Sequence, residues 1–259
     1  MRINNNLMAM NTHRQLGINN NAGAKSMEKL SSGYRINRAA DDAAGLSISE
    51  KMRSQIRGLG QASRNAQDGI SLIQTAEGAM DEVSNMLVRM KELAVQKANG
   101  TYSTTDTANI DAEMTALKAE MTNIQTNTKF NGIDVLNSGG ADINIAITHD
   151  ATTIAIKRGD ISAAVALSST STAAEIDTAI DSVNTSRSAL GALQNRLEST
   201  VRNVDTTAEN LQAAESRIRD VDMAKEMMTQ TKNNILQQAA TAMLSQANQA
   251  PQNVLQLLR

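Results

Sequence analysis

An unbroken heptad ladder of apolar residues runs through the C-terminal half of the chain. Its members stand seven positions apart: Ile176, Val183, Leu190, Leu197, Val204, Leu211 and Ile218. On a helix this spacing makes one apolar stripe, and a stripe of that length needs partner helices to cover it. A second ladder lies upstream and consists of Met52, Leu59, Ala66, Ile73, Met80, Leu87 and Ala94. The pattern predicts a mainly α fold of long, coiled-coil-like helical rods.

A third, shorter ladder steps by four and three residues: Ile110, Met114, Leu117, Met121 and Ile124. The composition agrees with long helices, because the single proline is Pro251 and no residue before it forces a helix to break. One Phe, two Tyr and no Trp exclude a core built on aromatic rings. The absence of cysteine excludes disulfides and thiolate metal sites.

Helix boundaries can be read from capping signals. The first rod is predicted from about residue 42 to 99, with Asn99-Gly100 supplying a left-handed residue at its end. The next helix opens at Ser103, with Asp106 completing an acidic capping box, and runs to about Asn127. A second capping box, Thr172 with Glu175, opens the long C-terminal rod.

The segment between these rods changes its period from helix to strand. After a turn at Asn131-Gly132, isoleucines alternate with other residues on both sides of a turn at 148–150, which predicts a β-hairpin near 140–167. The alternating isoleucines are Ile143, Ile145, Ile147, Ile154 and Ile156. Val165 and Leu167 are expected to add an edge strand.

The apolar stripe shifts sideways between Ile218 and Val221, a step of three instead of seven, which predicts a joint near 217–224. Both ends of the chain have weak stripes that bury too little surface to offset the entropy of ordering them. We therefore expect disordered ends in the free subunit and ordered ends in a polymer.

Several functional classes find no support in the sequence. A net charge of −2 without long charged runs gives no footprint for nucleic acid or a membrane surface. No window approaches the ~20 apolar residues of a membrane span, and the first 16 residues lack the apolar run of a signal peptide. His13 and His149 are the only histidines and neither belongs to an H-E-x-x-H motif, so we expect no metal, no cofactor and no enzymatic activity.

Five segments together resemble bacterial flagellin, the subunit of the flagellar filament. They are LSSGYRIN at 30–37, DDAAG at 41–45, QASRNAQDGIS at 61–71, FNGIDVL at 130–136 and NVLQLLR at 253–259. The resemblance implies a hairpin-shaped subunit whose N- and C-terminal helices pair. It also implies a self-assembling helical homopolymer for motility, which is secreted unfolded through the flagellar type III channel.

The same resemblance implies a division of the chain. Residues 1–31 and 225–259 would form the inner tube, 32–45 and 214–224 the joint, and 46–213 a rod domain without outer variable domains. The expected joint residues are Arg35, Asn37, Asp41 and Asp42. The expected assembly seams are Ile3, Leu7, Met10, Met228, Ile235, Ala242, Leu255 and Leu258.

Some of these residues have alternative interpretations. Asp41-Asp42 could be paired carboxylates for acid–base chemistry, but no third group completes a site, and capping of the helix that follows is favoured. The segment around Arg89 resembles the patch by which flagellins engage the Toll-like receptor that senses them, with Arg89, Leu93 and Glu120 as contacts. The alternative is that Leu93 packs inside the rod and Arg89 belongs to a solvated face.

Further partners follow from the resemblance alone. An export chaperone on the C-terminal helix and the filament cap and junction proteins are implied. A hook–filament junction protein and an intracellular coiled-coil adaptor remain alternatives to the filament subunit. The Ser/Thr-rich stretches 103–107 and 168–172 are compatible with O-glycosylation or with helix capping.

Overall fold

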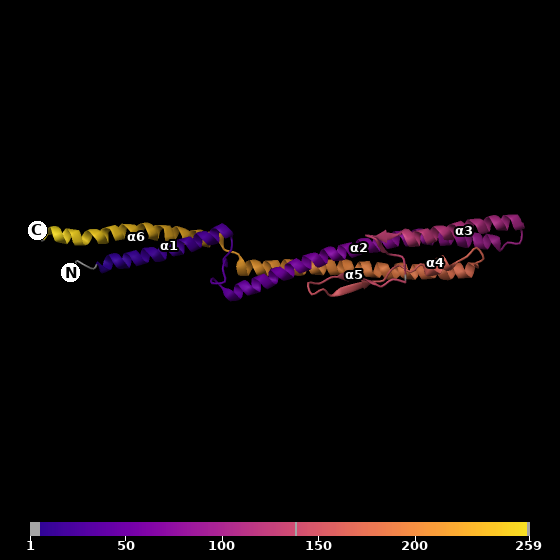
Figure 1. Cartoon of the computed structure of the whole chain (residues 1–259), viewed down its shortest axis with the longest axis horizontal. Coiled ribbons are helices and arrows are strands. Elements are labelled where there is room, and N and C mark those ends of the chain that lie inside the picture. The colour runs from indigo at the N-terminus through magenta and orange to yellow at the C-terminus, as the bar shows by residue number, and fades with distance from the viewer. Residues whose placement is uncertain (1–5, 138, 258–259) are drawn as a thin grey trace. The chain divides into compact units, whose positions relative to one another are not determined.

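The computed structural model describes residues 6–137 and 139–257, with side chains through Gln249, and this part of the chain forms six helices and four short strands (Figure 1). The helices are α1 (Leu7–Ser32), α2 (Ala43–Lys97), α3 (Thr104–Asn127), α4 (Ser162–Ala166), α5 (Ala173–Arg219) and α6 (Met223–Leu257). The strands are β1 (Lys129–Phe130), β2 (Ile133–Asp134), β3 (Ile143–Ala146) and β4 (Thr153–Ile156). The predicted mainly α fold is confirmed.

The chain divides into two compact units. The terminal unit comprises Met1–Ser54 and Leu211–Arg259, and the core unit comprises Gln55–Asn210. The helices α2 and α5 each contribute to both units.

The three predicted ladders meet in the core unit. Most of their buried members belong to one apolar cluster, which includes Ile73, Met80 and Leu87 of α2, Ile110, Met114 and Met121 of α3, and Ile176, Val183, Leu190 and Leu197 of α5. Leu59 and Val204 are buried outside this cluster. Ion pairs at the rim connect the same helices, with Arg89 of α2 bonded to Glu113 of α3, and Arg187 of α5 bonded to Asp81 of α2. Each apolar stripe is buried against the other two, and this burial stabilises the long helices.

Both predicted capping boxes are present. The Ser103 hydroxyl accepts a hydrogen bond from the Asp106 amide, and the Asp106 carboxylate accepts one from the Ser103 amide. The Ser103 hydroxyl also donates to the Asp106 carboxylate at 2.7 Å, and this bond, together with the one from the Ser103 amide, lowers the pKa of Asp106. At the start of α5, the Glu175 carboxylate accepts a bond from the Thr172 amide at 2.8 Å.

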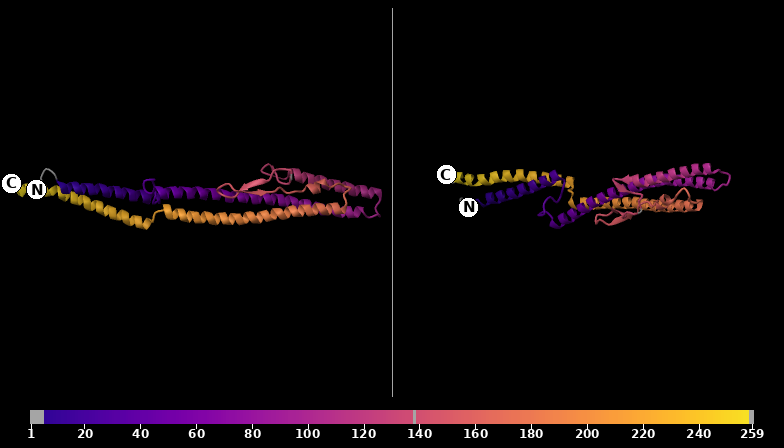
Figure 2. Two further views of the ribbon diagram at one scale, coloured as in Figure 1. Left: turned by 90° about the horizontal axis from the view of Figure 1, so that it is seen from below. Right: turned by 45° about the vertical axis from the view of Figure 1, so that its right-hand side comes forward.

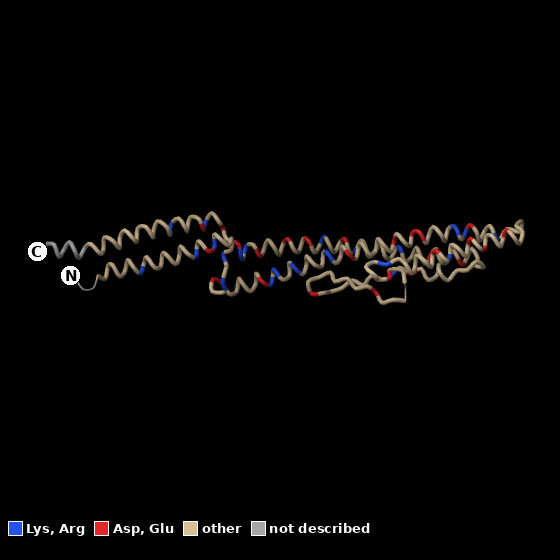
Figure 3. Tube along the Cα trace, turned by 45° about the horizontal axis from the view of Figure 1, so that its top comes forward, with Lys and Arg blue, Asp and Glu red and all other residues tan. Residues whose placement is uncertain are grey.

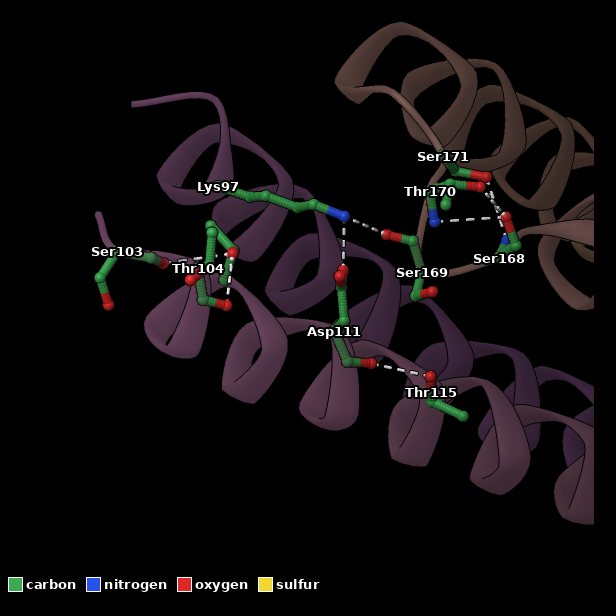
Figure 4. A network of polar contacts seen from close by, with 10 residues as sticks. Lys97, Ser103, Thr104, Asp111, Thr115, Ser168, Ser169, Thr170 and Ser171 are labelled. Carbon is green, nitrogen blue, oxygen red and sulfur yellow. Dashed lines mark hydrogen bonds and ion pairs between the residues drawn. The ribbon is translucent and has the colours of Figure 1, made fainter. Parts of the chain in front are cut away.

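The predicted left-handed ending of the first rod is wrong. The helix α2 ends at Lys97, and neither Asn99 nor Gly100 has a positive φ. The Lys97 ammonium donates to Asp111 Oδ1 at 2.5 Å and to the Ser169 carbonyl at 3.0 Å (Figure 4). Side-chain bonds to α3 and to the loop before α5 therefore fix this end of the core unit, and a glycine cap is not needed.

The predicted β-hairpin is confirmed, but it is shorter than 140–167. Strands β3 and β4 pair antiparallel, with Ile143 opposite Ile156 and Ile145 opposite Ile154. The edge strand at Val165 and Leu167 is wrong, because residues 162–166 form the short helix α4. The buried residues there are Ile161, Ala164 and Leu167, whose spacing of three is helical.

A second, smaller hairpin was missed. Strands β1 and β2 flank Asn131-Gly132, whose φ values of 49° and 77° are those of a two-residue hairpin turn. The turn itself was predicted, and the Asn-Gly pair was also the signal for the strands around it.

A helical glycine explains how the β3–β4 hairpin packs on α2. A Cβ added at Gly58 would lie 2.7 Å from the Cβ of His149, in the turn of the hairpin. Farther along, the Asn65 side-chain amide donates to the Ala146 carbonyl at 3.2 Å. Gly58 is therefore required for close packing within the core unit.

Candidate assembly surfaces

The helices α1 and α6 of the terminal unit lie side by side and antiparallel (Figure 2). The Asn6 side-chain amide donates to the Ala247 carbonyl at 2.7 Å at one end of the pair. At the other end, Tyr34 and Asp220 form an antiparallel β-bridge. The predicted pairing of the terminal helices is confirmed.

The fully buried residues of this helix pair are polar, whereas Leu16, Leu30 and Leu244 are half-buried. Its buried residues are Asn19, Ser26 and Gln230, which expose 8%, 4% and 9% of their surface. Asn19 accepts a bond from Gln15, and the Gln230 amide donates to Asn234. The Gln230 carbonyl oxygen is buried without a hydrogen-bond partner in the described part of the chain.

The exterior of the same pair carries many large apolar side chains among polar ones. Met8 is 73% exposed and Met228 is 67% exposed. The other exposed large apolar side chains on the two helices are Leu7, Met10, Ile18, Met27, Met223, Met227, Ile235, Leu236 and Met243. Residues 233–257 contain no charged side chain, and the stretch of α6 before its grey end is tan in Figure 3. An apolar surface of this extent is typical of a contact with another protein chain.

The predicted seam residues are distributed accordingly. Leu7, Met10, Met228, Ile235 and Ala242 are exposed on α1 and α6, so none of them packs within the pair. Ile3 and Leu258 lie outside the described residues, as does the side chain of Leu255.

The four predicted joint residues lie between α1 and α2, and each forms hydrogen bonds. The Asp42 carboxylate accepts from the Gly45 amide at 2.8 Å and so caps α2. The Asp41 carboxylate accepts from the amides of Arg38 and Asn37, and these bonds lower the pKa of Asp41. The Arg35 guanidinium donates to the Ile218 carbonyl. The two acids therefore organise backbone turns, as the capping interpretation requires.

Sequence reasoning missed Arg219, the last residue of α5. Its guanidinium donates to Glu50 Oε1 at 2.5 Å and lies 4.9 Å from the centre of the Tyr34 ring. This side chain is 13% exposed, and the hydrogen bond from Arg219 lowers the pKa of Glu50. The only sequence signal was its position beside the shift of the apolar stripe.

The receptor-like patch lies on α2 and α3. Arg89 is exposed, and its ion pairs with Glu92 and Glu113, chiefly the hydrogen bond to Glu92, raise its pKa. Glu120 of α3 is also exposed, and its carboxylate accepts a hydrogen bond from the Asn123 side-chain amide. Leu93 is 1% exposed and belongs to the apolar cluster, as the packing alternative holds.

The described residues contain no group of three or more His, Cys, Asp or Glu that could hold a metal ion. None of the helices in the same part of the chain is long and apolar enough to cross a membrane.

Comparison with known proteins connects these surfaces to a family. The chain matches the bacterial flagellin N-terminal helical region over residues 3–141 and the C-terminal helical region over residues 173–258. It is 56% identical to the flagellin of Halalkalibacterium halodurans and 49% identical to that of Bacillus subtilis, with 100% of each chain covered. The crystal structure of Bacillus cereus flagellin aligns with 59% of this chain and 94% of its own length, at 36% identity and a TM-score of 0.48.

The family models account for both terminal helices, the joint and most of the core unit. The curated relatives are equally complete matches, and their names are those of filament proteins and not of enzymes. The chain therefore belongs to the bacterial flagellins, the structural subunits of the flagellar filament.

Proposed function

We propose that copies of this chain join head to tail through the outward apolar faces of α1 and α6. The observation behind this proposal is the inverted polarity of the pair, with Asn19 and Gln230 buried while Met8 and Met228 face solvent. Covering such a surface with a different face of a neighbouring copy removes apolar area from water at roughly 25 cal/mol per Å². A contact between two different faces of identical chains propagates an open helix.

The division of labour along the chain follows from this proposal. Residues 1–31 and 225–259 form the inner tube of the filament, 32–45 and 214–224 connect it to the rod, and 46–213 form the rod domain. Assembly adds order to the terminal helices, because the pair buries little apolar surface in a single copy.

Three further partners belong to the proposal. The exposed apolar side chains of α6 need a cover before assembly, and a chaperone on this helix would supply it. The chain then passes the flagellar export channel unfolded and acts outside the cell, where cap and junction proteins bind the ends of the filament.

An interaction with a Toll-like receptor rests on the exposed charges of the patch. Arg89 and Glu120 are the proposed contacts, and Leu93 contributes by holding α2 in place from within the core. Arg89→Ala and Glu120→Ala should each weaken binding to the receptor ectodomain by about 5–30-fold, the effect of roughly 1–2 kcal/mol. Surface plasmon resonance measures this, with Glu82→Ala on the exposed face of α2 as the control. Unchanged affinity in both variants would remove these two residues as contacts.

The assembly proposal is tested by one substitution on the apolar face. Ile235→Asp should abolish polymerisation, because it introduces a charge into a contact that excludes water. Stability of the monomer should change by less than about 0.5 kcal/mol, since Ile235 is exposed. Sedimentation of salt-precipitated protein and thermal circular dichroism measure the two quantities, and Asn195→Asp on the exposed face of α5 is the control.

A truncation makes the same test more severe. Removal of residues 246–259 should leave a soluble, helical subunit that forms no filaments. Filaments of normal length from either the truncated chain or Ile235→Asp contradict the proposed contact.

A further inference from the structure

The helix pair of the terminal unit could bury its apolar surface in a different way. If α1 and α6 each rotated about their axes, Ile18 and Ile235 would face each other and Asn19 and Gln230 would face water. This exchange would bury two isoleucines in place of two amides, a change that the hydrophobic effect favours at these positions. The observed orientation therefore needs a cause outside the seam itself.

Polar contacts at the joint connect the end of α1 to the start of α6. Gly33 ends α1 with a left-handed φ of 74°, and its carbonyl accepts a bond from the Val221 amide at 3.0 Å. The Arg35 amide donates to the Arg219 carbonyl at 2.7 Å. Together with the bridge between Tyr34 and Asp220, these bonds align the end of α1 with the three residues that separate α5 from α6.

These bonds determine which face of α6 is directed toward α1. Successive residues of a helix are rotated by about 100°, so a slip of one residue in the link would turn a different face inward. Asp222 caps α6 by accepting a bond from the Lys225 amide at 3.1 Å, which leaves little slack between the bridge and the helix. The orientation of α6 about its axis is therefore set at residues 219–222.

Arg219 is the side chain that fastens this link. It bonds to Glu50 on α2 and lies over the Tyr34 ring, so it joins the start of α2, the end of α1 and the end of α5. A planar guanidinium can form the ion pair and the ring contact at the same time, which an ammonium does less well.

We propose that Arg219 is the positioning residue that sets the rotation of α6 against α1, and that it thereby keeps the apolar faces outward for neighbouring copies. Tyr34 and Glu50 are its partners. This inference rests on the proposed assembly through α1 and α6. It names the residue that orients the contact surface within one subunit.

The test measures helix rotation in the unassembled subunit, so it does not depend on polymerisation. The chain has no cysteine, and a Cβ at Gly23 would lie 3.9 Å from the Asn233 Cβ, a distance suited to a disulfide. Gly23→Cys with Asn233→Cys therefore reports the observed rotation. Ile18→Cys with Ile235→Cys, both exposed, reports the rotated alternative.

Each cysteine pair is combined with Arg219→Leu and, as the matched control, with Arg217→Leu. Arg217 lies in the same last turn of α5 and is exposed, and its side chain has no hydrogen bond or ion pair within the described residues. Under mild oxidation, Arg219→Leu should lower the yield of the 23–233 disulfide by roughly five-fold and raise that of the 18–235 disulfide, as expected for a loss of about 1 kcal/mol. Helix content should stay unchanged, and polymerisation of the cysteine-free variant should fail.

The outcomes separate this inference from the assembly proposal. Wild-type disulfide yields in Arg219→Leu overturn the positioning role, whether or not the variant polymerises. If Arg219→Leu loses helix content, the same disulfide yields are measured in Glu50→Gln, which removes the ion pair while keeping the size of the side chain. An unchanged 23–233 yield in Glu50→Gln then overturns the positioning role of Arg219. Normal filaments from Ile235→Asp would instead overturn the assembly contact and leave the disulfide result standing.

Discussion

The two units of this flagellin use the same kind of amphipathic helix in opposite ways. In the core unit, Ile73, Met114 and Leu197 point inward and meet within one chain. In the terminal unit, Met8, Met228 and Ile235 point outward while Asn19 and Gln230 are buried. The difference teaches that an apolar stripe predicts only that a helix packs against another apolar surface. Whether that surface belongs to the same chain or to another copy depends on which face of the helix is turned toward its partner helix within the chain.

The largest expected effect breaks the core unit. Leu197 is fully buried, and Leu197→Asp places a charge among apolar side chains that offer it no partner. We expect a loss of more than about 4 kcal/mol in the free energy of unfolding, because the cavity left by a truncated leucine alone costs 2–5 kcal/mol. Urea unfolding followed by circular dichroism measures this.

The matched control for that substitution is Asn195→Asp, two residues away on the exposed face of α5. A melting temperature for Leu197→Asp equal to that of the control would show that the ladder is not the source of stability. Comparison of Leu197→Asp with Ile235→Asp contrasts an apolar residue that is needed for folding with one that is expected to be needed only for assembly.

An intermediate effect concerns the end of α1. Gly33 has a φ of 74°, so Gly33→Ala should destabilise the terminal unit by about 1–2 kcal/mol through the left-handed conformation alone. Gly17 is also in α1, but it is helical and exposed with open space around it. Gly17→Ala should therefore stabilise α1 by about 0.5–1 kcal/mol. Hydrogen exchange of α1 amides distinguishes the two, and equal effects would argue against the capping role of Gly33.

The smallest effect is a dependence of the terminal unit on pH. The hydrogen bond from Arg219 lowers the pKa of Glu50, and the backbone bonds from Arg38 and Asn37 lower that of Asp41. A carboxyl whose pKa is lowered in the folded state contributes stability that is present above its ordinary value and is lost as pH falls through the lowered value. Because ordinary carboxyl values lie near 4, protection of the joint should decrease progressively below about pH 4.

Hydrogen exchange at residues 35–50 as a function of pH measures this decrease. Glu50→Gln should flatten the profile, whereas Glu82→Gln, an exposed acid of α2 in the core unit, should leave it unchanged. A profile that Glu50→Gln does not alter would assign the acid sensitivity to other groups.

Much of the core unit was predictable, because its signals are local. Heptad spacing identified the buried members of all three ladders, and the Ser103 and Thr172 capping boxes were found at the starts of α3 and α5. The errors arose where a short pattern fits two periods. Val165 and Leu167 alternate like a strand, yet Ile161, Ala164 and Leu167 are buried with helical spacing.

The terminal unit was less predictable because its structure depends on long-range pairing. The residues buried in the α1–α6 seam are polar, so hydrophobic periodicity could not identify them. Arg219 acts on Glu50 and Tyr34, which are far from it in sequence and share no motif with it. Asp41 and Asp42 were found because capping involves neighbours a few residues away.

The uncharged stretch from residue 233 to 257 has a consequence for the environment in which the filament works. Dissolved ions weaken attractions between charges, but they do not weaken the burial of uncharged side chains. A filament whose inner contacts are made by this stretch should tolerate wide changes in salinity. Cooling weakens apolar contacts, so low temperature should loosen the same filament.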